Sequence, residues 1–586
     1  MTSAAAEWSL AEAAWSSPEP QPVDCSFGTW SWQLRGDEVA DICFDGSLVL
    51  RMVRVVARDR DWNTVPTVVT GSRTEHSALE LDLAMVGFGA DIVATLRLEA
   101  SESLRVTVTG VSRSAFERNR LGLVVLHPPT AAGAPLVVVA PDGSRRETAF
   151  PTRVSPHQPA VDIAALEWTA GSIASALRFE GEVFEMEDQR NWTDASFKTY
   201  STPLALPFPV KLAAGSTFSQ AIELSCTRVA PTLPADQSVF RLTPAGHVPD
   251  VVVGASTAPD PAPSVTVPAA AILVEVETEQ SVWPDALARA ARSGLPLDVR
   301  IVTDGPERID AVLDQLAALP VVRVAVFSAS THVTEPELWA RLSASAEGHG
   351  LTAELVAGTR AHFTELNRSQ ERLAPAAAVT FSITPQMHAL ERAQLVESVA
   401  MQAVVARDAL EISGGRPLHI GPITLRSRFN AVSTTPREDG PPTLAGGYGA
   451  ALDPVATDPR QQSTALAAWT VASFASLAGT GVASICYFEE WGPRGLADTT
   501  GSPYPVLDAI SGLNALRGQL LLSPDRADPT LFVLGAVSSD TLTVLAANLA
   551  ASERTLEFES EHGSGRLTAP AFGIAIMKLP LGGTHA

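Results

Sequence analysis

The sequence predicts a multidomain protein in which a central (β/α)8 TIM-like barrel is flanked by an N-terminal β-sandwich and a small C-terminal β domain. Three observations predict this fold class. The chain has 586 residues, too many for a single hydrophobic core. In its central part, short apolar strands alternate with helices, which is the pattern of a parallel sheet. On both sides of that part, strands follow strands with few helix signals between them.

The N-terminal part predicts an antiparallel sandwich. Its short apolar runs are separated by Gly, Pro, Asp and Asn, a spacing typical of sandwiches. These runs include Leu48 to Ala57, Ala94 to Leu98, Leu104 to Val108 and Leu121 to Leu126. We assign residues 1–254 to this domain, and we expect the Pro- and Ala-rich residues 255–270 to form a linker or an extended domain edge.

Residues 271–522 predict the barrel. Seven apolar strands are expected, at residues 272–276, 299–302, 322–327, 354–357, 378–383, 418–425 and 482–488. Helices separate them, and one begins at Thr334-Glu335-Pro336-Glu337, with an N-cap, a Pro in the first turn and a capping-box Glu. The eighth strand is not obvious, and we look for it between Arg426 and Pro459. A doubly wound open sheet is the alternative.

One uncharged segment, Gln461 to Phe488, is long enough to span a bilayer. It contains several Ser and Thr residues, however, and Gly479-Thr480-Gly481 divides it. We therefore expect a buried helix that ends near Ala478, a glycine turn, and a buried strand that begins at Val482.

The pattern returns to β in residues 523–586, the predicted C-terminal domain. Four short strands are expected, at residues 530–535, 542–548, 555–558 and 573–579. These are too few for an independent sandwich. We expect a small sheet packed on the barrel, completed with help from the N-terminal part.

Charge and cysteine usage narrow the class of protein. The formal net charge is −23, and such a field repels phosphate backbones and anionic membranes, so nucleic-acid and membrane partners are disfavoured. The four cysteines are scattered without a CxxC pair, and the N-terminus does not have the pattern of a signal peptide. A reduced, cytoplasmic location is the simplest interpretation.

Several familiar catalytic motifs are missing from the sequence. It contains no GxSxG elbow, P-loop, GxGxxG or HExxH motif, and its histidines form no HxH pair. This disfavours a serine α/β-hydrolase, a nucleotide enzyme and a zinc protease. We expect neither a cofactor nor a metal ion, and a metal-dependent lactonase is the alternative.

Because barrel enzymes place their chemistry where strands end, we examined the residues after each predicted strand. Glu365 and Asn367 follow the strand at 354–357, where the alternative is a helix N-terminus with solvated charges. Gln386 and His388 follow the strand at 378–383, where the alternative is a capped turn with a structural histidine.

Glu489, Glu490 and Trp491 follow the strand at 482–488. Two adjacent carboxylates at the exit of a buried strand are costly unless they are used or paired, and the Trp could stack on a sugar ring. The alternative is one structural salt bridge and one solvated acid. We predict Glu365, His388, Glu489 and Glu490 as catalytic residues, and Asn367, Gln386 and Trp491 as substrate-binding residues.

The N-terminal domain contains an unusual polar run, FEMEDQRNWTDASFKTY, at residues 184–200. It has little apolar alternation and many hydrogen-bonding side chains. We expect this run to fold over the barrel mouth and to bind substrate through Arg190, Trp192 and Lys198. An ordered polar network between domains is the alternative.

The same segments carry a family resemblance. The run at residues 184–200, GTRAHFTELNR, TPQMHALE, CYFEEWGPRG and the stretch from Arg120 to Pro128 resemble stretches of the D-apionate lactonase family. They occur in the same order from about residue 115 to 495, and so the resemblance covers most of the chain. Met387 and Leu390 depart from the usual side chains around His388, which affects the expected substrate contacts.

The resemblance implies an N-terminal β domain, a barrel and a small C-terminal β domain, and the hydrolysis of D-apionolactone to D-apionate in apiose breakdown. The expected mechanism is water attack on the lactone carbonyl, with Glu489 or Glu490 as base and Glu365 as acid, or the reverse. A small-molecule sugar lactone is the expected partner, and the oligomeric state is open. A retaining glycoside hydrolase with paired glutamates is the main alternative, and a non-catalytic carbohydrate-binding protein is the third.

Overall fold

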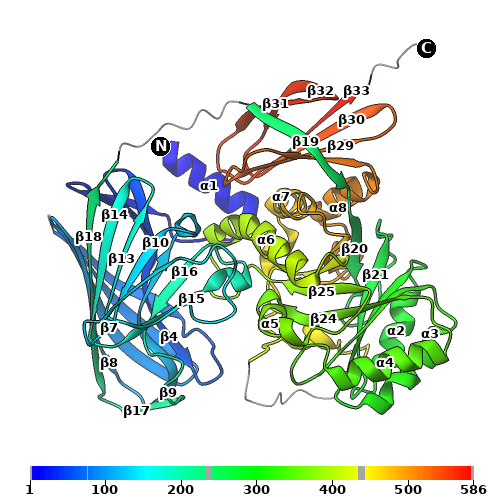
Figure 1. The fold of residues 1–586 in the computed structure, drawn as a ribbon, viewed down its shortest axis with the longest axis horizontal. Helices are drawn as coiled ribbons and strands as arrows, with labels where there is room; N and C mark the ends of the chain where they lie inside the picture. Colours follow the sequence, from blue (N-terminus) through cyan, green and yellow to red (C-terminus); the bar gives the residue numbers. More distant parts are fainter. Residues whose placement is uncertain (1–2, 76, 231–238, 433–441, 582–586) are drawn as a thin grey trace.

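The computed structural model describes residues 3–75, 77–230, 239–432 and 442–581. Three sheet-based bodies make up this part of the chain: a sandwich, a closed barrel and a C-terminal sheet. In Figure 1 the sandwich, coloured blue to cyan, lies beside the barrel, coloured green to yellow. The C-terminal sheet, mostly orange and red, lies above the barrel in the same view.

The sandwich consists of two nine-stranded sheets. The first has the order β1 (Val23–Phe27), β2 (Trp30–Arg35), β3 (Glu38–Phe44), β4 (Ser47–Asp59), β9 (Phe116–His127), β16 (Phe197–Tyr200), β15 (Phe184–Asp188), β12 (Ala160–Ile163), with β17 (Val210–Leu212) paired to β9. The second has the order β11 (Arg145–Ala149), β10 (Pro135–Val139), β13 (Ala165–Ala170), β14 (Ile173–Glu180), β18 (Thr217–Arg228), β8 (Leu104–Ser112), β7 (Ala90–Ala100), β6 (Ala78–Gly87), β5 (Thr67–Glu75).

Alternating burial explains why these segments form a sandwich. Along β7, apolar residues at every second position are buried and those between them are more exposed. One core cluster collects the inward side chains of both sheets, including Val53 and Val125 from the first and Leu96 and Leu177 from the second. The predicted N-terminal sandwich is therefore present.

In the described residues, the barrel is a closed sheet of eight parallel strands, and seven α-helices follow its strands from β21 onward. Its strands are β20 (Asp250–Gly254), β21 (Ala271–Glu277), β22 (Leu297–Val302), β23 (Val321–Phe327), β24 (Glu354–His362), β25 (Ala378–Ile383), β26 (Leu418–Ile423) and β27 (Ser484–Glu489). The helices are α2 (Trp283–Ala291), α3 (Ile309–Leu316), α4 (Pro336–Gly348), α5 (Phe363–Arg368), α6 (Arg392–Ser413), α7 (Thr464–Ala478) and α8 (Pro505–Ala515). The 3₁₀ turns are η1 (Pro129–Ala131), η2 (Gln189–Trp192), η3 (Pro306–Arg308), η4 (Gln370–Arg372), η5 (Gly449–Leu452) and η6 (Pro459–Gln462).

Two details of the predicted barrel need correction. The eighth strand is β20, at residues 250–254, which the sequence placed in the N-terminal domain. Part of the Arg426 to Pro459 segment, where we looked for it, lies outside the described residues. The Pro-rich residues 255–270 connect β20 to β21 within the barrel and do not link two domains. The strand is hard to find because it has only five residues and no helix follows it.

The uncharged segment folds as predicted. Helix α7 ends at Ala478, Gly479 is its C-cap, and β27 begins at Ser484. Both elements are buried in the barrel, whose core includes Trp469, Phe474 and Tyr487. Among the described residues, no helix combines the length and the apolar character needed to cross a bilayer.

The C-terminal sheet has seven strands in the order β32 (Gly563–Ala569), β31 (Arg554–Ser560), β19 (Val239–His247), β28 (Leu520–Pro524), β29 (Leu531–Val537), β30 (Thr541–Asn548), β33 (Ile574–Pro580). Strand β19 comes from the chain before the barrel, so a segment of the N-terminal part completes this sheet, as predicted. Figure 1 shows this green strand among the red and orange ones. Helix α1 (Ser3–Trp15) packs here too, and its Trp15 makes an edge contact with Phe572.

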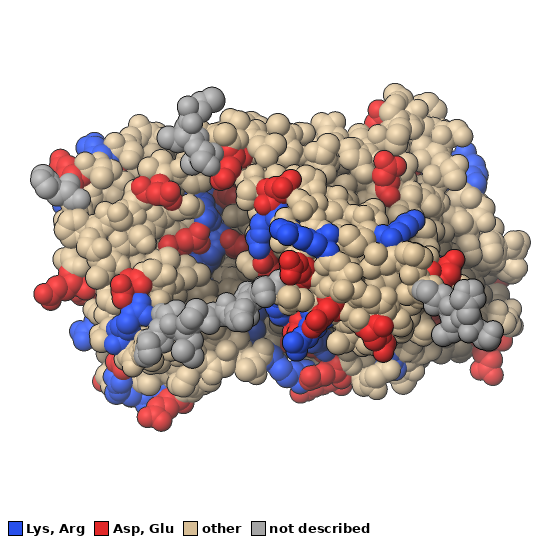
Figure 2. Space-filling view, turned by 90° about the horizontal axis from the view of Figure 1, so that it is seen from above, with Lys and Arg blue, Asp and Glu red and all other residues tan. Residues whose placement is uncertain are grey.

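The sandwich is joined to the barrel by ion pairs. Arg51 Nε lies 2.7 Å from Glu397 Oε2, and Arg54 Nη1 lies 3.2 Å from Glu391 Oε1. Both arginines are on β4, and both glutamates are at the start of α6. On the face seen in Figure 2, acidic and basic side chains are interspersed rather than separated by sign.

Candidate active site

A cavity of about 250 Å³ lies at the carboxyl ends of the barrel strands. Residues from β20, β21, β24, β26 and β27 line it, together with segments that follow β20, β21 and β26. The carboxyl ends of all strands in a parallel barrel meet at one face, which is where barrel enzymes hold their catalytic groups. The segment after β20 contributes Ala255 and Thr257, so the Pro-rich connection is part of this cavity.

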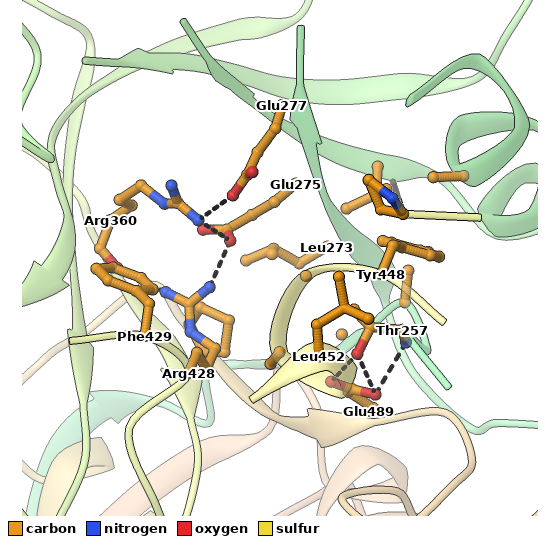
Figure 3. Close-up of a pocket in the computed structure, with 18 of the residues that line it drawn as sticks. Thr257, Leu273, Glu275, Glu277, Arg360, Arg428, Phe429, Tyr448, Leu452 and Glu489 are labelled. Carbon is orange, nitrogen blue, oxygen red and sulfur yellow. Dashed lines mark hydrogen bonds and ion pairs between the residues drawn. The ribbon is translucent and has the colours of Figure 1, made fainter. Parts of the chain in front are cut away.

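One wall of the cavity is a network of two carboxylates and two guanidinium groups (Figure 3). Glu275 and Glu277 are two residues apart on β21, and both side chains line the cavity because strand side chains alternate. Arg360 Nη2 lies 3.0 Å from Glu275 Oε2 and 3.0 Å from Glu277 Oε1. Arg428 Nη1 lies 2.5 Å from Glu275 Oε2. The wall is thus an alternating set of negative and positive groups.

The electrostatics of this wall keep Glu275 ionised. Burial alone would raise the pKa of Glu275, but the Arg360 and Arg428 guanidinium groups outweigh it and lower the pKa to about 2. The two glutamates in turn raise the pKa of Arg360 despite its burial. Arg428 also donates to the Arg360 carbonyl oxygen at 2.6 Å, which locks the two arginines side by side.

The facing wall contains Glu489, the last residue of β27 (Figure 3). Its Oε2 accepts from the Thr257 backbone N–H at 3.0 Å, and its Oε1 accepts from Arg494 Nη2 at 2.6 Å. Phe488 has a φ of 51°, in the left-handed region, which interrupts the strand alternation. Phe488 and Glu489 therefore both line the cavity, although they are consecutive residues.

Aromatic rings complete the lining. Tyr448, Trp283 and Phe429 border the cavity, and the Tyr448 hydroxyl donates to the Ser256 carbonyl oxygen at 2.8 Å. Burial raises the pKa of Tyr448 to about 12, so it stays a neutral donor. The Phe429 ring lies 4.5 Å from the Arg360 guanidinium carbon. Flat apolar faces beside fixed charges suit a ligand with a carbon skeleton and several hydroxyl groups.

Of the three residues predicted at the exit of β27, Glu489 lines this cavity and Glu490 and Trp491 are not among its described lining residues. The backbone N–H of Glu490 donates to the Gly254 carbonyl oxygen, and burial raises the pKa of its carboxyl to about 7. Trp491 is buried, with its ring 5.3 Å from the Arg289 guanidinium carbon.

Four other predicted residues lie between the barrel loops and their neighbours, outside the described cavity lining. Glu365 caps α5, where its Oε2 accepts from the His362 backbone N–H at 2.9 Å. Asn367 donates to Val154 O and Asn191 Oδ1, at 3.0 Å in each case. Gln386 bridges Asp458 and Arg460, and His388 Nδ1 lies 2.8 Å from Asp194 Oδ2.

The polar run at residues 184–200 forms β15, η2 and β16, and it contacts the loops after β24 and β25. Within it, Arg190 is buried, pairs with Asp188 at 2.7 Å and donates to three backbone carbonyl groups of residues 151–153. Lys198 pairs with Glu187 at 2.5 Å, and the Trp192 ring makes an edge contact with His388. The run therefore lies at the junction of sandwich and barrel, beside the cavity described above rather than in its lining.

The main residues that sequence reasoning missed are Glu275, Glu277, Arg360 and Arg428. A signal for the first two was present in AILVEVE, where two acids occupy alternate positions at the end of an otherwise apolar strand. Arg360 lies within the GTRAHF stretch, but β24 extends to His362, five residues beyond its predicted end. Arg428 follows β26 in an irregular loop, where no pattern distinguishes it. Among the described residues, no group of three or more His, Cys, Asp or Glu side chains could hold a metal ion.

A closed parallel barrel with a charged cavity at its strand ends defines the protein as a (β/α)8-barrel enzyme. A family model described as the D-apionate lactonase N-terminal domain matches residues 10–229, and one described as the D-apionate lactonase TIM barrel domain matches residues 254–518. The chain belongs to the D-apionate lactonase family. A curated relative, the D-apionate lactonase of Brucella anthropi, is 27% identical over 552 residues, covering 86% of this chain and 88% of its own.

The solved structures that resemble this chain are much more distant in sequence. A GH30 endoxylanase from Clostridium papyrosolvens is 8% identical with a TM-score of 0.36, covering 58% of this chain and 100% of its own. SrfJ from Salmonella typhimurium is 8% identical with a TM-score of 0.38, covering 65% of this chain and 98% of its own. Similarities this low carry no argument about activity.

Proposed function

We propose that the protein hydrolyses D-apionolactone to D-apionate, with the lactone bound in the barrel cavity. The observation that carries this proposal is the charged wall of Glu275, Glu277, Arg360 and Arg428 opposite Glu489, in a chain of this family. The cavity of about 250 Å³ corresponds to roughly eight waters at about 30 Å³ each. That is enough for a single-ring sugar lactone.

The reaction needs a base for water and charge stabilisation at the carbonyl oxygen. Glu277 is best suited as the base because its partners are Arg360 and one amide, from Gln280, and its side chain keeps 29% of its surface exposed. Water would give a proton to Glu277 and attack the carbonyl carbon. The ring C–O bond then breaks, and the leaving ring oxygen takes the proton back, which yields the hydroxy acid.

The remaining groups would bind and polarise the lactone. Arg360 and Arg428 present guanidinium N–H groups at the cavity wall, which suits them to stabilise negative charge on the carbonyl oxygen. Glu489, held by Thr257 and Arg494, has little freedom to move and suits a role in accepting hydrogen bonds from substrate hydroxyl groups. The predicted acid role of Glu365 has no support from the cavity lining, which does not include this residue among those described.

The test is acid release from D-apionolactone in weakly buffered solution, with and without EDTA. Wild type should release acid, and Glu277→Gln should lower kcat/KM by at least about 100-fold. Glu347→Gln is the matched control, because Glu347 is exposed on α4, and it should match wild type. Unchanged turnover in Glu277→Gln would remove Glu277 as the base. Absence of acid release from wild type, together with cleavage of an aryl glycoside, would favour the glycosidase alternative.

A further inference from the structure

A second group of charged and aromatic side chains lies where the sandwich meets the barrel. We call it the interdomain cluster: Arg58, Glu187, Trp192, Asp194 and Lys198 from the sandwich, and Arg368 and His388 from the barrel loops. Contacts across the junction hold it together. His388 Nδ1 lies 2.8 Å from Asp194 Oδ2, and the Arg368 guanidinium carbon lies 5.5 Å from the Trp192 ring centre. None of these residues is among the described lining of the barrel cavity.

The imidazole of His388 is held in a fixed orientation. Asp194 Oδ1 accepts from Gln394 Nε2 at 2.9 Å, and Gln394 Nε2 also donates to the Pro385 carbonyl oxygen at 2.9 Å. Asp194 is anchored in this way and contacts Nδ1 of the imidazole. The ring is therefore oriented with Nε2 on the edge that faces away from Asp194. The Trp192 ring stands perpendicular to the imidazole, with centroids 5.1 Å apart.

Three side chains of the cluster are partly accessible to solvent, whereas Asp194 is buried. The side chains of His388, Lys198 and Glu187 keep 18%, 16% and 14% of their surface exposed. By contrast, the Arg190–Asp188 pair nearby keeps 3% and 0%. Burial lowers the pKa of His388 well below its usual range, so the ring is neutral at pH 7 and can donate or accept a hydrogen bond.

The charge of the cluster is positive in a protein whose net charge is −23. Lys198 and Arg368 act electrostatically on the carboxyl group of Glu187, and Lys198 and Arg58 act on that of Asp194. Burial raises the pKa of Asp194 well above its usual range, which favours a positive local charge, and lowers the pKa of Lys198, which opposes it. Basic groups beside a carboxylate acceptor and an indole face match a small anion that also carries hydroxyl groups.

We propose that the interdomain cluster binds a small polyhydroxylated carboxylate, a sugar acid of the class that lactone hydrolysis yields. The choice of ligand rests on the proposed function, whereas the site does not. Lys198 and Arg368 would hold the carboxylate, Glu187 and His388 would bond the hydroxyl groups, and Trp192 would cover a carbon face.

The test is calorimetric titration of D-apionate into the full-length protein. Lys198→Met and Trp192→Ala should each weaken Kd by at least about tenfold. Lys211→Met is the matched control, because the Lys211 side chain is 82% exposed, and it should bind as wild type does. Glu347→Gln, at an exposed position of α4, is a second control and should also leave Kd unchanged. Trp192→Ala leaves every charge in place, so it tests the site even if Lys198→Met does not fold.

Two outcomes would overturn the inference. In the first, Glu277→Gln weakens binding, whereas Lys198→Met and Trp192→Ala leave Kd unchanged. The acid would then bind in the barrel cavity. In the second, wild type does not bind D-apionate at millimolar concentration. Failure of the proposed function is a separate result: a wild type that binds the acid through Lys198 and Trp192 but does not hydrolyse the lactone keeps this site.

Discussion

At the residue scale, three glutamates around the barrel cavity differ in how they are held. Glu275 lies between two guanidinium groups, which lower its pKa to about 2. Glu489 is bound by Thr257 and Arg494 and keeps only 8% of its side chain exposed. Glu277 keeps the most exposure of the three, and its ion-pair partner is Arg360. Proton transfer requires a carboxylate that can exchange partners during the reaction, and so Glu277 is the strongest candidate.

Two features of Glu365 point to different roles, one catalytic and one structural. Burial raises its pKa to about 7, which by itself would suit a general acid, but its carboxylate caps α5. Glutamine keeps an oxygen that can accept from the His362 N–H. We therefore expect Glu365→Gln to retain its melting temperature and to keep kcat within about threefold of wild type, since removal of a true acid costs about 100-fold or more.

Steady-state kinetics and a thermal melt of the same preparation decide between the two roles of Glu365. A loss of about 100-fold in kcat with an unchanged melting temperature would restore the catalytic acid role that the sequence predicted. Glu365→Ala should behave differently, because it removes the cap acceptor as well and should lower the melting temperature.

At the element scale, β21 carries both the barrel core and one wall of the cavity. Its first four residues are apolar and buried. Glu275 and Glu277 lie at alternate positions among its last three residues. The network around Glu275 stabilises two buried cations, because the Arg360 and Arg428 side chains are only 8% and 11% exposed. A strand that ends in paired charges can therefore remain part of a closed barrel.

This role predicts a loss of stability when the charge of Glu275 is removed. Glu275→Gln should lower the free energy of unfolding by about 3 kcal/mol, because it leaves buried guanidinium groups without their counter-charge. Glu335→Gln is the control, since its partner Arg372 is 61% exposed, and it should change the free energy by less than about 1 kcal/mol. Urea unfolding followed by circular dichroism measures both, and equal midpoints for the two variants would contradict this account.

At the scale of the whole molecule, the sandwich is joined to α6 of the barrel by a group of buried charges. Burial raises the pKa of Glu38 to about 7, although Arg51 and Arg54 oppose the shift, and Glu391 and Asp37 add to it. The folded protein thus holds this proton more tightly than the unfolded chain, whose reference pKa is 4.5. The contribution of Glu38 to stability therefore decreases as pH rises from about 4.5 and is lowest above about 7.

Glu38→Gln should remove this dependence, because glutamine does not ionise. The melting temperature of the variant minus that of wild type should increase between about pH 5 and pH 8. Over this range the variant should gain at most on the order of 3 kcal/mol in free energy of unfolding relative to wild type. Glu102→Gln, at an exposed position of the sandwich, is the control and should show a constant difference. A Glu38→Gln difference that decreases with rising pH would show that the pKa of Glu38 is not raised.

Local patterns in the sequence determined much of the architecture. Short apolar runs separated by Gly, Pro, Asp and Asn predicted the sandwich, apolar strands between helices predicted seven of the barrel strands, and the glycine turn after Ala478 predicted the end of α7. The family followed from short motifs. These features depend on neighbours a few residues apart, and such spacing is visible in a single chain.

Only the tertiary structure decided which polar side chains meet. It showed that β20 closes the barrel, that β19 crosses to the C-terminal sheet, and that Glu275, Arg360 and Arg428 form one wall although 153 residues separate the first from the last. The left-handed Phe488 turned Glu489 into the cavity, while Glu365 and His388 pair with groups elsewhere. The physical reason is that strand exits are local features, whereas the direction of each side chain depends on barrel closure and on packing between segments far apart in the chain.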